Sequence, residues 1–287
     1  MLVWFVLTGL SLAFVVFDIP STPEHPVVRW AFIILVLFTG PLGAFFYVLG
    51  CREPLKHAHE AYIAAPWRQV LGSTMHCAAG DGLGIIAGAA IAAWMRFSAW
   101  ADLGLEYALG FGFGWAFFQA FAMRDMAGGS YLRSLKLTFL PEFLSMNLLM
   151  AGMVATAKVL MPSFTGSGDP MRPEFWFVMS MALIVGFILA YPINWWLVAN
   201  GLKHGMFTVR KEQEATQFEH GMTHMARDDH ARKPWPLATM GMTALSIIVL
   251  GVGIAVSRVL GTRTGNDRAS SRNVRSYSNT AIRARGP

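Results

Sequence analysis

Long apolar runs separated by short polar segments constrain this chain more than any other feature of its sequence. The run at residues 70–94 reads VLGSTMHCAAGDGLGIIAGAAIAAW. As a helix rising about 1.5 Å per residue, it is long enough to cross the roughly 30 Å hydrocarbon core of a bilayer. A segment inside a bilayer must satisfy its own backbone hydrogen bonds, which a helix does. We therefore predict an all-α fold, a polytopic transmembrane helical bundle.

The composition supports a membrane protein. Hydrophobic residues make up 54% of the chain and charged residues only 14%, whereas soluble domains are usually about 25% charged. The net charge of +6 comes from Lys and Arg that lie between the apolar runs and in the tail. Membrane topology explains these charges better than a nucleic-acid partner does. The expected surroundings are a lipid bilayer, with no nucleic acid.

We predict about seven helices. The expected spans are residues 2–17, 27–50, 70–94, 103–123, 137–160, 174–200 and 237–257. The first is marginal, because sixteen residues reach only about 24 Å. The second contains Gly40-Pro41, where we expect a kink because proline removes a backbone donor.

The spans divide the chain into four parts. These are residues 1–67 with two N-terminal transmembrane helices, 68–207 with four helices, 208–260 with a Met/His loop and the last helix, and 261–287, a disordered basic tail. The tail is predicted to be disordered because it is rich in Arg, Ser and Asn and has few hydrophobic residues.

Lysine and arginine in the short loops predict the orientation. The loops after the second, fourth and sixth spans carry twelve of them, against four at the other ends, namely Arg29, Arg96, Lys158 and Arg172. Cytoplasmic loops carry the excess of basic residues, so the first group should be cytoplasmic. The tail conflicts with this rule, because it lies on the other side and carries seven arginines.

The third span combines a glycine stripe with polar side chains. The stripe repeats every four residues and consists of Gly72, His76, Gly80, Gly84 and Gly88. A neighbouring helix can pack closely against such a stripe. A second row beside it holds Ser73, Cys77 and Asp81. An ionisable group inside a membrane helix costs at least about 2.5 kcal/mol, which makes Asp81 a functional candidate. The alternative is that these polar groups only fix helix packing.

Polar and sulfur side chains of several spans fall at one depth. With the predicted orientation, the cytoplasmic half contains His76, Cys77, Asp81, Gln119, Met123, Glu142, Met146, Asn147 and Asn194. Scattered structural hydrogen bonds would have no reason to gather at one level. A site or a cavity that opens to the cytoplasm would explain the clustering.

Residues 68–207 contain, in this order, the motifs TMHCAAGDGLGIIAG, ALGFGFGWAFFQ, MRDMAGGSY, LPEFLSMNLLMAGM and YPINWWLVANGLKHGM. Together these motifs resemble an uncharacterised bacterial membrane family, domain of unknown function 4396. The resemblance implies a small helical domain of the bacterial inner membrane, sometimes linked to copper-oxidase-type modules, with no established activity. Many members resemble one another in the paired His-Cys, here His76 and Cys77.

Two groups of residues are candidate metal ligands. Thioether, imidazole and thiolate groups suit soft metals, copper above all. The first group is His76, Cys77, Met146 and Met150, and the second is His220, Met222 and His224 in the long polar loop. Adjacent helical residues diverge by about 100°, so His76 and Cys77 cannot both chelate one ion in a regular helix. Core filling by the methionines and a solvated histidine-containing loop are the alternatives.

Three functions remain open from the sequence. The first is handling of a transition metal, copper in particular, in a multi-pass protein of the bacterial inner membrane. The second is a non-catalytic assembly protein that binds a membrane partner or a second copy of itself. The third is proton-coupled transport of a small solute, with Asp81 and Glu142 as the proton carriers. No GxxxxGK[ST], HExxH, CxxC or GxSxG motif occurs, so enzymatic activity is not the expectation.

Overall fold

A computed structural model describes residues 1–22, 26–51, 65–124, 129–203 and 236–283, and the regular elements within these ranges are all helices. Five of them are long and apolar enough to cross a membrane. They are α1 (Leu2–Asp18), extended by the short 3₁₀ turn η1 (Ile19–Ser21), α5 (Pro66–Met95), α8 (Tyr131–Leu160), α9 (Pro173–Ala199) and α11 (Pro236–Arg283). The prediction of an all-α, multi-pass membrane bundle is confirmed.

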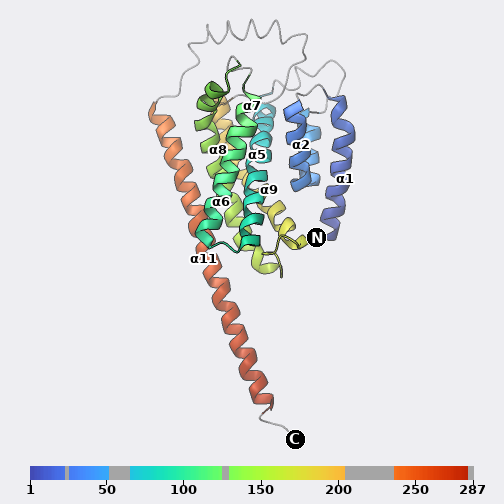
Figure 1. Cartoon of the computed structure of the whole chain (residues 1–287), viewed down its shortest axis with the longest axis vertical. Helices are drawn as coiled ribbons and strands as arrows, with labels where there is room; N and C mark the ends of the chain where they lie inside the picture. Colours follow the sequence, from blue (N-terminus) through green and yellow to red (C-terminus); the bar gives the residue numbers. More distant parts are fainter. Residues whose placement is uncertain (23–25, 52–64, 125–128, 204–235, 284–287) are drawn as a thin grey trace.

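Helix α5 lies at the centre of the bundle (Figure 1). In its apolar window 67% of the residues are buried, compared with 11% in α11 at the periphery. Helices α8 and α9 cross closely, because a Cβ on Gly152 would lie only 2.7 Å from the Cα of Gly186. Packing of this kind depends on small residues at the contact.

The predicted fourth span is a continuous rod made of α6 (Ala99–Phe111), the π-helix η2 (Gly112–Gln119) and the short α7 (Ala120–Ala122). It packs along the glycine stripe of α5. A Cβ on Gly80 would lie 3.0 Å from the Cα of Gly114, and one on Gly88 would lie 2.8 Å from the Cα of Glu106. The predicted close seam is therefore present.

The prediction that residues 27–50 form one kinked transmembrane span is wrong. In its place stand two short helices, α2 (Pro26–Thr39) and α3 (Pro41–Cys51), joined at Gly40 with φ +55°. The ring of Tyr47 contacts the ring of Phe32 with centroids 5.4 Å apart, although fifteen residues of straight helix would separate them by about 22 Å. The chain therefore reverses at Gly40-Pro41, where only a kink was expected.

The helices α2 and α3 form a re-entrant hairpin. Because the hairpin does not cross the membrane, the N-terminus lies on the opposite face from the one that a full second span would give. The hairpin's two outer ends meet the end of α1, because Tyr47 donates a 2.9 Å hydrogen bond to Asp18 and Arg29 donates one of 2.7 Å to the carbonyl of Thr22. Its tip lies against Thr8, near the middle of α1. Arg29 thus joins the predicted cytoplasmic face, which makes the bias thirteen to three.

Helix α11 runs along α8 and then extends beyond the bundle (Figure 1). It continues through Arg283, so residues 261–283 are helical where the sequence predicted a disordered tail. Adding a residue to an existing helix avoids the cost of nucleation, which favours continuation beyond an apolar helix. Residues 208–235, the predicted Met/His loop, lie outside the described residues.

Substitution of the α5 seam should harm folding more than substitution of an open glycine. We expect Gly84→Leu to lower the melting temperature in detergent well below that of the parent, because a side chain there would meet the backbone of Leu109 and Gly110. Gly112→Leu is the matched control, since nothing lies within 4 Å of a Cβ at Gly112. Equal loss in both variants would contradict a seam.

The re-entrant hairpin predicts that the N-terminus and the segment around Gly128 lie on opposite faces of the membrane. An epitope tag before Met1 should be accessible to antibody on intact spheroplasts. A tag at Gly128 should react only after permeabilisation, as should one at Thr216. If the N-terminal tag and the Gly128 tag share one face, α2 and α3 form a full crossing and the hairpin is wrong.

Candidate functional site: a buried lysine with a thiol and carboxyl groups

Lys203 enters the bundle from the chain that follows α9. Two residues beyond the end of the helix, Gly201 has φ +66°, a left-handed conformation that glycine adopts without strain. The backbone N–H groups of Leu202 and Lys203 both donate to the carbonyl of Leu197, at 2.9 and 3.2 Å. This turn directs the lysine inward, and its side chain is fully buried.

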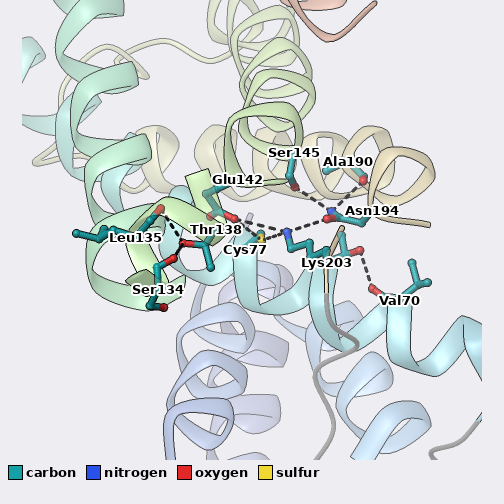
Figure 2. A network of polar contacts seen from close by, with 11 residues as sticks. Val70, Cys77, Ser134, Leu135, Thr138, Glu142, Ser145, Ala190, Asn194 and Lys203 are labelled. Carbon is teal, nitrogen blue, oxygen red and sulfur yellow. Dashed lines mark hydrogen bonds and ion pairs between the residues drawn. The ribbon is translucent and has the colours of Figure 1, made fainter. Parts of the chain in front are cut away.

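The ammonium of Lys203 has three partners from three helices (Figure 2). It lies 2.6 Å from Sγ of Cys77 on α5 and 2.9 Å from Oδ1 of Asn194 on α9. It also lies 3.5 Å from Oε2 of Glu142 on α8, which completes a buried ion pair. The same Oε2 accepts a 3.1 Å hydrogen bond from the Cys77 thiol. Glu142 therefore bridges the lysine and the cysteine.

Asn194 is held so that its oxygen faces the lysine. Its Nδ2 donates to Oγ of Ser145 at 2.9 Å and to the carbonyl of Ala190 at 3.0 Å. With both bonds made by the amide nitrogen, Oδ1 remains free to accept from Lys203. The predicted site residues Cys77, Glu142 and Asn194 are thus brought together.

A second carboxyl group, that of Asp81, lies one helical turn from Cys77 along α5. Gly114 of the π-helix lies between the two acids, since a Cβ there would collide with Oδ1 of Asp81 and lie 2.9 Å from Oε1 of Glu142. Both oxygens of Asp81 and Oε1 of Glu142 are buried and receive no hydrogen bond from any other described group, but the two carboxyl groups lie close enough to share a proton in a hydrogen bond with each other. Buried polar atoms are nearly always bonded, and a bond between two carboxyl groups requires a proton on one of them, so this part of the site holds a proton.

His76 precedes Cys77 on α5 but its ring faces η2, the element in which Gln119 also lies. The imidazole of His76 packs against the ring of Phe118 on η2, with centroids 5.5 Å apart, and neither ring nitrogen has a described partner. Gln119 is buried with its Oε1 unpaired among the same residues. The orientation of His76 agrees with the predicted divergence of adjacent helical residues.

The methionines of the first predicted copper group lie inside the bundle, and the role of that group as copper ligands stays a prediction. Met146 and Met150 are fully buried, and the terminal methyl of Met146 lies against Gly110 of α6. Within the described ranges, no three His, Cys, Asp or Glu side chains are grouped so as to hold a metal ion. The second predicted group, His220, Met222 and His224, lies outside the described residues.

Asn147 connects three helices deeper in the bundle. Its Oδ1 accepts a 2.8 Å hydrogen bond from the hydroxyl of Tyr107 on α6, and its Nδ2 donates to Oγ of Ser246 on α11 at 3.2 Å. Asn147 follows Glu142 by five residues on α8, which is about 7.5 Å along the helix. It lies between the lysine and the opposite end of the bundle.

The opposite end of the bundle contains a pocket of about 440 Å³. Its charged lining comes from Asp102 and Glu106 on α6, Lys158 on α8 and Arg258 on α11. Glu106 directly precedes Tyr107 in the chain. The Tyr107–Asn147 pair therefore lies, along the bundle, between the Lys203 site and this pocket.

Sequence reasoning missed Lys203, because it was counted only as one of the basic residues in the loop after the sixth span. The signal was available in YPINWWLVANGLKHGM. A glycine just beyond a helix end often turns the chain back, and Lys203 follows Gly201 by two residues.

These features define a multi-pass membrane protein with an ionisable site buried in its helical bundle. Residues 66–203 match the family described as "Domain of unknown function (DUF4396)", and this part of the chain is a DUF4396 domain. The match begins at the first residue of α5 and ends at Lys203, so it contains Cys77, Asp81, Glu142 and Asn194 as well. No curated protein and no solved structure matches the chain.

Removing the lysine should destabilise the protein through its buried partners. We expect Lys203→Met to cost about 3–5 kcal/mol, because Glu142 loses its counter-charge in a buried environment. The double variant Lys203→Met/Glu142→Gln should recover part of this loss, measured as thermal unfolding in detergent. Lys136→Met, at an exposed position of α8, is the control. Additive losses in the double variant would contradict the pairing.

Proposed function

We propose that this protein is a proton-coupled transporter of a small solute, in which Lys203, Cys77, Glu142 and Asp81 exchange protons. The observation that carries the proposal is the buried lysine shared between a thiol and a carboxyl group, with a second carboxyl group one turn away. Ionisable residues in membrane spans are costly and mark proton relays and substrate paths.

The balance of charge in the site supports exchange. One cationic group meets three acidic groups, and a low-dielectric interior favours a neutral total. With Lys203 charged, one acid is ionised and the other two keep their protons. Moving the negative charge between Glu142 and Cys77 or Asp81 requires only short proton transfers, since Glu142 Oε2 contacts both Lys203 and Cys77.

Polar side chains continue from this site toward the other face. Along α8, Asn147 lies about 7.5 Å beyond Glu142, and Lys158 lies about 16 Å farther on. Tyr107 and Asn147 are hydrogen-bonded to each other, and Glu106 borders the pocket that opens at that end. If these polar groups only fixed helix packing, they would have no reason to follow one another from this site to the opposite face.

The competing predictions account for less of this arrangement. Assembly explains the glycine seams but not a buried lysine with two nearby acids. Copper binding stays a prediction, and the ammonium beside Cys77 repels a cation at that sulfur. The bacterial inner membrane, implied by the resemblance described above, is the membrane in which we propose that the transporter works.

Proton flow in liposomes tests the proposal. The purified full chain is reconstituted with a pH-sensitive dye inside, and a potassium diffusion potential drives proton entry. We expect the dye signal to change faster than in protein-free liposomes. We expect Glu142→Gln and Asp81→Asn each to reduce the rate to the protein-free level, because amides cannot carry the proton.

Asp169→Asn serves as the control, since Asp169 is exposed and far along the chain from the site. Equal rates for the wild type and the protein-free liposomes would overturn the proposed proton route. Retained flow in both Glu142→Gln and Asp81→Asn would exclude these acids as carriers.

A further inference from the structure

The distance between Lys203 and Cys77 is unusually short for a hydrogen bond to sulfur. Nζ and Sγ are 2.6 Å apart. Hydrogen bonds from nitrogen to oxygen have typical lengths of about 2.9–3.0 Å, and the larger sulfur atom should lengthen the separation further. A 2.6 Å contact is too short for two non-bonded atoms of this size and too long for a direct nitrogen–sulfur bond. A single bridging oxygen fits this separation.

We propose that Cys77 and Lys203 form a covalent oxygen bridge, Sγ–O–Nζ, when the protein is exposed to dioxygen. The bridge would be an oxidative modification site that joins α5 to the chain segment after α9. The proposal is independent of proton transport, because it concerns only the covalent state of the two side chains.

The reaction is balanced with dioxygen as the oxidant. The thiol S–H bond and one N–H bond of the neutral amine break, and S–O and O–N bonds form. The two hydrogens leave with the second oxygen atom as water. Sulfur and nitrogen lose two electrons each, and dioxygen gains four. Two equivalents of a dithiol return these electrons and restore the thiol and the amine, with release of the bridging oxygen as water.

Glu142 is placed to prepare the amine. A charged ammonium has no lone pair to form a bond, so it must first lose a proton. Oε2 of Glu142 lies 3.5 Å from Nζ and 3.1 Å from Sγ, and can accept that proton. Dioxygen is apolar and dissolves in hydrocarbon, so it can reach a site that excludes water. Sulfenic acids condense with nitrogen in proteins by related chemistry.

The bridge would also remove a charge from the site. A bridged Lys203 is no longer an ammonium, and Cys77 no longer holds a proton. Glu142 then keeps the proton that it accepted, and the region becomes neutral without an ion pair. Oxidation would thus join Cys77 and Lys203 in a form in which neither side chain carries an ionisable S–H or ammonium group.

Mass spectrometry of the full-length protein tests the bridge directly. One sample is purified in air and another under argon with reductant, and both are digested without reduction. In the aerated sample we expect a linked peptide pair, joined at Cys77 and Lys203, with one oxygen gained and two hydrogens lost. Trypsin should no longer cleave after Lys203. Dithiothreitol should return both peptides to their unmodified masses.

Matched variants separate this bridge from other oxidation. Cys51→Ser should keep the linked pair, whereas Cys77→Ser should lose it. Unmodified peptides alone in the aerated wild type would overturn the proposal. So would a sulfenic or sulfinic acid on Cys77 with free Lys203, or a link that contains no added oxygen. The wild-type comparison stands even if a variant does not fold.

Discussion

A charge buried in a membrane protein must be balanced, and the arrangement around Lys203 follows from this constraint. Its side chain is fully buried, and an unpaired ammonium in such a position would cost several kcal/mol. Three helices each supply one compensating group, Cys77 from α5, Glu142 from α8 and Asn194 from α9. The mutual positions of these helices are therefore tied to the chemistry of the site.

Small residues make this convergence possible. Gly114 leaves room for the carboxyl groups of Asp81 and Glu142, which any larger residue would displace. Gly114 lies in the π-helix η2, an element that often occurs at functional sites. The Gly152–Gly186 contact likewise brings α8 close to α9. The glycines that let the helices approach closely therefore also leave the space in which the buried polar groups meet.

The sequence predicted the fold class and much of the site because these depend on local patterns. The repeat of small residues every four positions along 70–94 predicted the close helix contact. The depth of each residue along its span predicted that Cys77, Glu142 and Asn194 lie at one level. Lys203 was missed because its inward direction depends on the left-handed conformation at Gly201, and the glycine beyond the helix end was not used as a sign of a turn. The reversal at Gly40-Pro41 was missed for a related reason, since one positive φ turns a kinked helix into a hairpin.

The hairpin places a non-helical turn at membrane depth, which is tolerated only where protein covers it. At the tip, the N–H of Gly40 bonds to Val36 and the hydroxyl of Thr39 bonds to Leu35. Thr8 of α1 covers the tip from the side. Local bonds satisfy the turn and α1 shields it from lipid, so α1 must stay packed on the hairpin. The N-terminal helix is thus required for the hairpin, although it lies outside the DUF4396 domain.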